Sequence, residues 1–319
     1  MTLLARIPIA YERMLGEKPH LAGAANAASP PAPILTDAAD IETGDTNIEK
    51  ETKSAVKKEN DMRGIDLQPI LPWMLGLSTL LSGSCMMFFQ VPLLARLASL
   101  PFGVLSVSCA LLYGMTMACM AYAARTDPGQ VDIPDDVERQ NVPARAHKSW
   151  LYSRAIRRYD HFCRWLGNVI GLLNHREFFI MLVGLALIAV LGLIADVAIT
   201  VLLWKAHKLC WLHLAILLPH FVYSGFLLYH EGEILRIHAG LIARNELAYE
   251  FKRDEHYVIH RPDGPVDAGD VSGSEYNEHF DAGTIEYCSQ KNPYDQGVAQ
   301  NCVTFWCAAR WPTDAAGDF

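Results

Sequence analysis

Long runs without charge constrain this chain more than any other feature. Two of them, 67–95 and 97–124, contain no charged residue and are separated by a single arginine. A third, 178–204, holds one acid, and a fourth covers 209–229. A hydrocarbon core of ~30 Å is crossed by ~20 helical residues. The runs therefore predict four membrane-spanning helices, and helices buried in a large water-soluble core are the less favoured alternative.

Composition agrees with this and excludes other classes. Of the 319 residues 51% are apolar and only 19% are charged, although long stretches are polar, so the apolar residues are concentrated in a few segments. The formal net charge of −8 argues against a nucleic-acid-binding protein, which needs a basic excess. The eight cysteines contain no CxxC pair, which disfavours both a disulfide scaffold and a cysteine-rich metal finger.

The fold class that we expect is an all-α polytopic membrane protein with a loop domain between the second and third helices. The segments are a disordered N-terminal tail (1–66), two helices (67–124), the loop domain (125–177), two further helices (178–230) and a C-terminal tail (231–319). Within the pairs, the helices are placed near 70–90, 102–124, 178–204 and 209–229, with a turn at 92–101. Residues 262–284, rich in Gly, Asp and Ser, are expected to form a solvated linker.

The distribution of Lys and Arg predicts the orientation. The loop 125–177 and the membrane-proximal parts of both tails are rich in these residues, whereas the two turns between paired helices carry few. Positive charge accumulates on the cytosolic side of membrane proteins. Both termini and the loop are therefore expected in the cytosol, where thiols stay reduced.

The loop contains a possible nucleophile. Asp160, His161 and Cys163 bring a carboxylate, an imidazole and a thiol within four positions. A free thiol has a pKa near 8.5; an adjacent imidazole can take its proton, and a carboxylate can hold that imidazole in one tautomer. Taken alone, this string is equally compatible with a chance occurrence in which His161 and Cys163 only pack.

The surrounding motifs add weight. An Asp-Pro-Gly element follows the second helix, and the string Asp-His-Phe-Cys-x-Trp-x-Gly-Asn-x-x-Gly-x-x-Asn begins at Asp160. The segment 243–246 ends in Glu, and an Asn-Pro-Tyr-Asp-x-Gly-x-x-x-Asn element begins at residue 292. In this order and topology they resemble the DHHC family of protein S-acyltransferases. The matching motif residues are Asp127, Pro128, Gly129, Trp165, Asn168, Gly171, Asn174, Glu246, Asn292 and Asn301, with Glu246 alone kept from Thr-Thr-x-Glu.

The resemblance implies a function. It would make the chain a palmitoyltransferase that uses a long-chain acyl-CoA, such as palmitoyl-CoA, as co-substrate. Cys163 would carry the acyl group, with His161 as general base and Asp160 orienting it. The partners would be membrane-associated proteins with cytosolic cysteines, acyl-CoA and the bilayer, without nucleic acid. The chain would be an integral protein of the endomembrane system or plasma membrane.

This chain departs from the family at the zinc ligands. The positions that bind two zinc ions in the family fall on Lys148, Ser149, Tyr152, Ala155, Phe162 and Val169, with an earlier pair near Pro134 and Val137. These residues offer neither imidazole nor thiolate. The chain resembles a fungal-type subgroup with an aromatic third residue, here Phe162. We expect the loop to bind no zinc. We expect the packing of its apolar and aromatic residues to keep it folded instead.

Basic residues of the loop are candidates for binding the phosphates of CoA, against the alternative that they only set orientation. They are Arg145, Lys148, Arg154, Arg157 and Arg158. The acyl chain is expected among the helices, where each buried CH₂ yields ~0.8 kcal/mol. Small residues at 78–84 leave room for it, although close helix packing is the preferred explanation of them.

Polar residues within the spans have simpler explanations. We expect Asp196 to meet solvent at the far boundary, and His213 and His220 to be packed or hydrogen-bonded. Two other functions remain open. A non-catalytic adaptor would have lost activity with its zinc, which the retained Asp160, His161 and Cys163 oppose, and a channel or transporter would need more polar groups in the spans.

Overall fold

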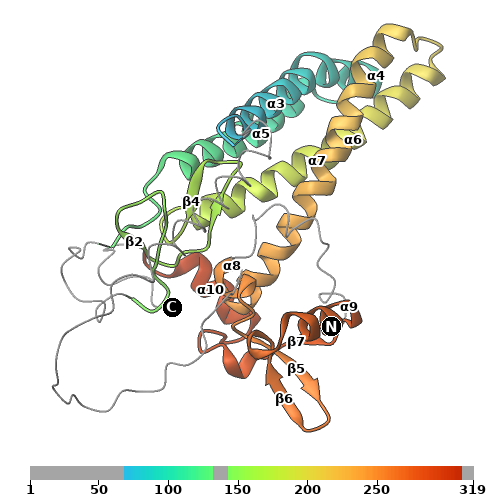
Figure 1. The fold of residues 1–319 in the computed structure, drawn as a ribbon. Coiled ribbons are helices and arrows are strands. Elements are labelled where there is room, and N and C mark those ends of the chain that lie inside the picture. The colour runs from blue at the N-terminus through green and yellow to red at the C-terminus, as the bar shows by residue number, and fades with distance from the viewer. Residues whose placement is uncertain (1–67, 132–142, 311–319) are drawn as a thin grey trace, which may run out of the picture.

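The computed structural model describes residues 68–131 and 143–310, so the predicted disordered tail lies outside the described residues. Four helical segments form an elongated bundle (Figure 1). They are α3 (Leu71–Cys85) continued by η1 (Met86–Gln90) and α4 (Val91–Leu97), then α5 (Phe102–Arg125), α6 (His175–Lys205) and α7 (Trp211–Arg244). All four segments are long and apolar enough to cross a membrane, as predicted.

Two boundaries differ from the prediction. The first segment continues through η1, a π-helical turn, to Leu97, and only 98–101 form the turn. Pro92 lacks an amide hydrogen, and the wider π turn before it accommodates the lost helical bond. The last segment continues from the predicted end at 229 to Arg244, since nothing before Asn245 breaks the helix. Asn245 stops it with a left-handed conformation (φ 47°).

The bundle is held by close packing and by a buried polar cluster. The Cβ of a residue larger than glycine at position 184 would lie 2.2 Å from Thr116 Oγ1, so α5 and α6 approach closely there. Asp196 is 2% exposed, so the expectation that it meets solvent is wrong. Gln90 Nε2 donates to its Oδ1 at 2.7 Å, and His220 Nδ1 lies 2.8 Å from its Oδ2. A carboxylate in an apolar bundle needs such partners.

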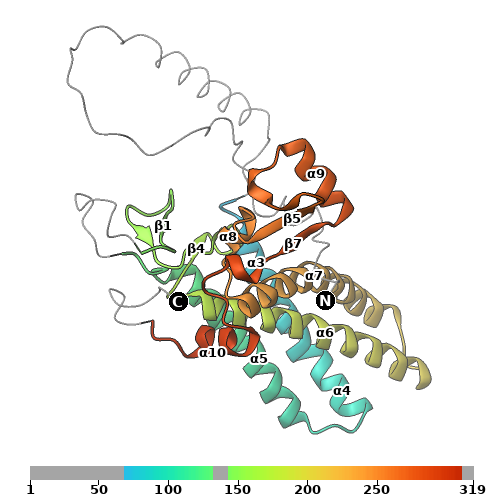
Figure 2. The same ribbon diagram turned by 90° about the horizontal axis from the view of Figure 1, so that it is seen from below.

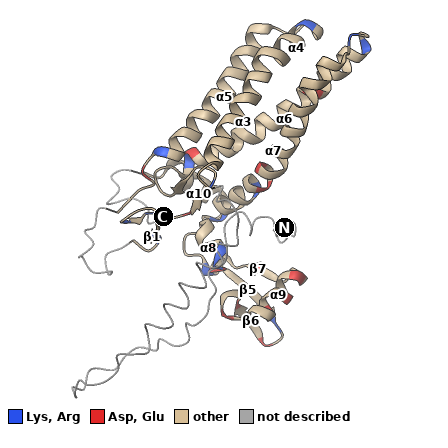
Figure 3. Ribbon diagram, turned by 45° about the horizontal axis from the view of Figure 1, so that its top comes forward, with Lys and Arg blue, Asp and Glu red and all other residues tan. Residues whose placement is uncertain are grey.

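One end of the bundle carries the smaller elements (Figure 2). Between α5 and α6 in the chain lie two hairpins, β1 (His147–Lys148) with β2 (Ala155–Ile156) and β3 (His161–Cys163) with β4 (Asn168–Ile170). The fold is therefore mostly helical rather than all-α. The β3–β4 hairpin reverses through a turn that contains Gly167, whose positive φ (65°) favours glycine. Charged residues gather at this end, and the bundle itself carries few (Figure 3).

The C-terminal part folds into further structure at the same end. It consists of α8 (Ala248–Lys252), β5 (Tyr257–Arg261), β6 (Gly264–Asp267), η3 (Ala268–Asp270), α9 (Gly273–Ala282), β7 (Ile285–Tyr287), η4 (Ser289–Lys291) and α10 (Val298–Cys307). The strands form one antiparallel sheet in the order β6-β5-β7. The expected linker at 262–284 is thus wrong. The adjacent residues Val258 and Ile259 of β5 are buried. The Ser272 side chain caps α9 by accepting a hydrogen bond from the Glu275 N–H.

Candidate active site

The β3–β4 hairpin brings the predicted nucleophile and base together. His161 faces Ile170 across the hairpin, Phe162 faces Val169, and Cys163 faces Asn168. Successive side chains of a strand point to opposite faces. His161 and Cys163 therefore lie on one face and Phe162 on the other. The spacing His-x-Cys is what a strand needs to place an imidazole beside a thiol.

Asp160 precedes β3 and is fully buried. Its Oδ2 lies 2.7 Å from His161 Nδ1, and its Oδ1 accepts a hydrogen bond from the Ala248 backbone N–H at 2.8 Å. Burial alone would raise the pKa of this carboxyl, but the imidazoles of His175, His161 and His238 outweigh burial and hold the pKa well below its usual range. Asp160 is therefore a carboxylate that fixes the tautomer and orientation of His161.

His161 is charged at neutral pH. Burial opposes the charge, but the hydrogen bonds with Asp160 and Cys163 prevail and raise the pKa of His161 to about 9. An imidazolium beside a sulfur stabilises the thiolate, which is the nucleophilic form of cysteine. The three residues thus form an orienting carboxylate, an imidazolium and a nucleophile in the arrangement expected for covalent catalysis.

Cys163 lies at the end of the helix bundle, in apolar surroundings. Cys163 is 8% exposed and belongs to a hydrophobic cluster to which all four helical segments contribute. Leu75 comes from α3, Met120 from α5, Phe178 from α6 and the partly buried Ile234 from α7. The nucleophile is therefore surrounded by apolar side chains at the end of the bundle.

Two further histidines flank Asp160. His175 Nε2, at the start of α6, lies 3.9 Å from Oδ1, and His238 Nδ1, on α7, lies 3.9 Å from Oδ2. Both side chains are at least nine-tenths buried. The sequence offered no signal for His238, because it lies on the part of α7 that was assigned to the tail.

The Asp-Pro-Gly element forms the turn after α5. Asp127 Oδ1 accepts hydrogen bonds from the N–H groups of Gly129 and Gln130, and Pro128 O accepts one from Leu173 N–H. Gly129 has φ +109°, a conformation that favours glycine. The element therefore attaches the end of α5 to the segment before α6.

The motif residues after Cys163 hold the hairpin onto the helices. Asn168 Nδ2 donates to the carbonyls of Ala123 and Thr126 at 3.0 Å, and Asn174 Nδ2 donates to Ala123 O at 3.2 Å. A Cβ at Gly171 would lie 2.7 Å from Pro128 O, which requires glycine there. Trp165 packs against the hydrophobic cluster around Cys163.

The C-terminal motif residues cap α7. Asn292 Nδ2 donates to Arg244 O and Asn301 Nδ2 to Ala243 O, both at 2.9 Å, so two of the last carbonyls of the helix are satisfied. Glu246 Oε2 accepts from Arg244 Nε at 2.9 Å and does not contact Asp160. Glu250, which the sequence analysis did not single out, is instead bonded to Arg145 and to the Leu247 N–H at the start of α8.

The five basic candidates lie in two environments. Arg145, Arg157 and Arg158 are at most 5% exposed, whereas Lys148 and Arg154 are exposed. Burial, reinforced by the neighbouring Arg145, lowers the pKa of Arg158 to about 9. Phosphate binding by these residues stays a prediction, and only Lys148 and Arg154 are at the surface to make such contacts.

The residues at the zinc positions of the resemblance do not fit a zinc ion. Tyr152 Oη donates to Asn168 Oδ1 at 2.7 Å, and the Phe162 ring meets Trp150 edge-on at 5.1 Å between centroids. Val169 is fully buried, and Lys148, Ser149 and Ala155 carry no imidazole or thiolate. Pro134 and Val137 lie outside the described residues.

Among the residues that the structure describes, two other groups have donor atoms within 4.8 Å of one another, Asp160–His161–His238 and Glu250–Glu255–His256. Both centre on carboxylates that already have partners in the protein: Asp160 is bonded to His161 and Ala248, and Glu250 to Arg145. They do not replace the missing ligand set.

The comparisons point to the same chemistry. Residues 137–255 match the sequence model of the DHHC palmitoyltransferase family. The chain is 30% identical over 186 residues to human Palmitoyltransferase ZDHHC12 and 26% identical over 179 residues to the mouse protein, in each case over 54% of this chain and 53% of the relative. Palmitoyltransferase AKR1 of Naumovozyma castellii is 45% identical over 54 residues, 16% of this chain and 7% of the relative.

The chain thus spans about half the length of the ZDHHC12 proteins that it matches. The similarity covers the catalytic hairpin, α6 and α7, which are the elements that form the site.

Proposed function

We propose that this chain is a protein S-palmitoyltransferase that acts at the cytosolic face of a membrane of the endomembrane system or at the plasma membrane. The observation that carries this proposal is the Asp160–His161–Cys163 arrangement at the end of an apolar four-helix bundle. The match of residues 137–255 to DHHC palmitoyltransferases supports it. The quartet Asp-His-Phe-Cys, with Phe162 packed on Trp150, supports a zinc-free member with an aromatic third residue.

The first step loads the enzyme. The Cys163 thiolate attacks the thioester carbonyl of acyl-CoA, the new S–C bond forms, and the S–C bond to CoA breaks. CoA leaves as a thiolate that takes the proton of the His161 imidazolium. Lys148 and Arg154 are the exposed residues offered to its phosphates. The acyl chain extends into the hydrophobic cluster around Cys163.

The second step transfers the group. Neutral His161 removes the proton of a substrate cysteine thiol, whose sulfur attacks the acyl-Cys163 carbonyl. Cys163 leaves as a thiolate beside the regenerated imidazolium. One thioester replaces another, so the step is nearly isoenergetic and depends mainly on positioning.

The test is self-acylation of the purified full-length chain with a palmitoyl-CoA analogue that carries an alkyne. We expect label on Cys163 that neutral hydroxylamine removes, followed by loss of that label when a cysteine peptide is added. Absence of label on Cys163 in folded protein would instead support a catalytically inactive adaptor.

A further inference from the structure

Asp160 depends on an element far away in the sequence. Its Oδ2 faces His161, and its Oδ1 is held by the N–H of Ala248, the first residue of α8. The backbone N–H supplies a hydrogen bond without adding a charge or a flexible side chain. The position of α8 therefore decides which way the carboxylate points, and with it the direction of the His161 ring.

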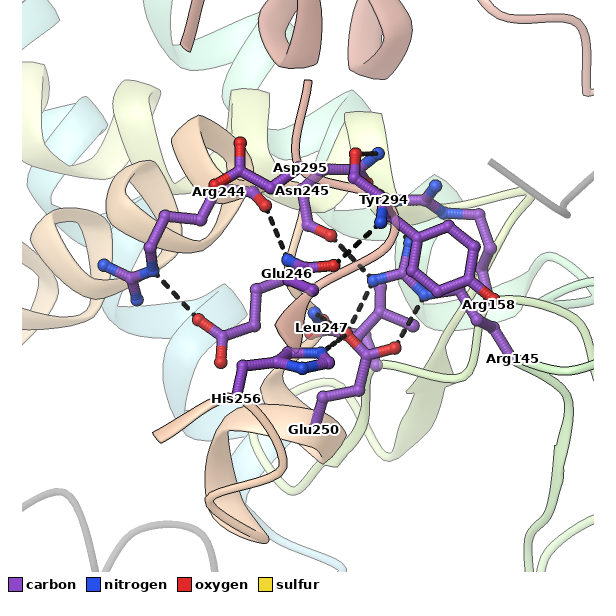
Figure 4. A network of polar contacts seen from close by, with 12 residues as sticks. Arg145, Arg158, Arg244, Asn245, Glu246, Leu247, Glu250, His256, Tyr294 and Asp295 are labelled. Atoms are coloured by element: carbon purple, nitrogen blue, oxygen red, sulfur yellow. Dashed lines mark hydrogen bonds and ion pairs between the residues drawn. The ribbon is translucent and has the colours of Figure 1, made fainter. Parts of the chain in front are cut away.

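A buried ion pair holds α8 in place (Figure 4). Arg145 donates through Nε to Glu250 Oε1 and through Nη2 to Glu250 Oε2, both at 2.6 Å. Glu250 Oε2 also accepts from Leu247 N–H at 2.8 Å, which closes the first turn of α8 around Ala248. A bidentate pair of this kind fixes orientation as well as distance.

Arg145 also contacts the segment that precedes Asp160 and the end of α7. Arg145 O accepts a hydrogen bond from Tyr159 N–H at 3.1 Å, next to Asp160 in the chain. Its guanidinium donates to Asn245 O at 2.8 Å and stacks on the Tyr294 ring at 4.0 Å. Arg145 is 2% exposed. One residue thus connects the backbone before Asp160 with the end of α7 and with α8.

We propose that Arg145 and Glu250 form a positioning pair for acyl transfer, which sets the Ala248 N–H against Asp160 so that Oδ2 remains directed at His161. The proposal rests on the proposed function and assigns a role to Glu250, which is not one of the predicted site residues. Glu246 is bonded to Arg244 and Tyr257, away from Asp160.

The consequence is a change in the state of Cys163. If α8 shifts, Asp160 loses its second partner and holds the His161 ring less well, so Cys163 is expected to react more slowly at neutral pH. The other charged or titratable groups that face this pair are His175 from α6, His238 from α7 and Arg158 from the loop. The Glu250→Gln substitution leaves all of them in place.

The experiment measures the rate of Cys163 alkylation by iodoacetamide against pH, by mass spectrometry of the Cys163 peptide, in the full-length chain without acyl-CoA. In Glu250→Gln we expect the rate at pH 7 to fall about tenfold, with the same plateau at high pH. Glu246→Gln breaks an equally buried pair and should leave the profile unshifted. Arg145→Lys, which keeps the charge but not the bidentate geometry, should shift it in the direction of Glu250→Gln.

Profiles of Glu250→Gln and Arg145→Lys that superimpose on that of the unmodified chain would overturn the proposal, as would an equal shift in Glu246→Gln. Should Glu250→Gln not fold, Arg145→Lys carries the test. The readout does not require acyl transfer. A chain that shows the shift but forms no acyl-Cys163 would contradict the proposed function and leave the positioning pair standing.

Discussion

Phe162 lies opposite Val169 in the β3–β4 hairpin, at two positions that bind zinc in the family that the chain resembles. The ring points away from the His161–Cys163 face and contacts Trp150. A pair of apolar side chains across a hairpin stabilises it without a metal. We therefore expect the loop to be ordered by packing.

Phe162→Ala should lower the free energy of unfolding by up to ~1.5–3 kcal/mol, the value for full burial of an aromatic side chain, because the ring is partly buried. It should also reduce self-acylation, because His161 and Cys163 are its neighbours on the strand. Phe162→His should not create a zinc site, since the partner positions lack ligands. Denaturant titration measures the stability of Phe162→Ala, and metal analysis by plasma mass spectrometry measures whether Phe162→His binds zinc. Stoichiometric zinc in the unmodified chain, with activity lost to a chelator, would contradict the packing account.

His161→Ala should slow self-acylation by ~10²-fold or more at pH 7, as expected for a lost acid–base group. In the unmodified chain His161 stays protonated up to a pKa of about 9 and stabilises the thiolate. Without it no imidazolium stabilises the thiolate, and raising the pH, which favours thiolate over thiol, should restore part of the rate. Rates measured from pH 6 to 9.5 test this, and an unchanged rate at pH 7 would refute the role of His161.

The Arg145–Glu250 pair should make stability depend on acid. Burial alone would raise the pKa of Glu250, but His256, 3.7 Å from Oε2, and the hydrogen bonds from Arg145 lower it to about 2. A carboxyl whose pKa is lowered by folding stabilises the fold above its unfolded pKa of about 4.3 and loses that contribution as pH falls towards 2. The stability difference between the unmodified chain and Glu250→Gln should shrink over this range. Denaturant titrations at pH 7, 4 and 3 measure it, and a constant difference would count against the pair.

Asp196→Ala should destabilise the bundle by roughly 1–3 kcal/mol, because it leaves buried polar groups of Gln90 and His220 without their acceptor. Thermal unfolding in detergent gives the effect. Thr200→Val, one turn later, removes only a hydroxyl that donates to the Asp196 backbone carbonyl. It is the matched control and should be much milder. Equal effects of the two substitutions would show that Asp196 contributes no more than an ordinary helix contact.

The sequence alone predicted the four long helices, because their apolar composition is sufficient to identify them. Four apolar runs predict four helices because a bilayer leaves few alternatives for them. The end of α7 and the β5–β7 sheet were missed, since 231–284 has no strong periodicity and its order comes from contacts with the rest of the chain. Asp196 was placed in solvent because its partners Gln90 and His220 come from other helices.

The residues of the site likewise fall into those that the sequence predicts and those that it does not. Asp160, His161 and Cys163 are close in sequence, and the alternation of a single strand is sufficient to bring two of them together. The Ala248 N–H and His238 reach Asp160 only because α7 returns to the hairpin, and a backbone donor leaves no trace in residue types. Arg145 was one of five candidates for phosphate binding, and its burial against Glu250 could not be read from the sequence.

The central claim is that Cys163 carries an acyl group as a thioester. The most direct measurement is intact and peptide mass spectrometry of the full-length chain after incubation with palmitoyl-CoA, with the Cys163→Ser variant in parallel. We predict a palmitoyl adduct on the Cys163 peptide that hydroxylamine removes, and no hydroxylamine-sensitive adduct at position 163 or on a substrate cysteine in Cys163→Ser. Transfer to substrate that persists in Cys163→Ser, or a folded unmodified chain that never forms the adduct, would contradict the account.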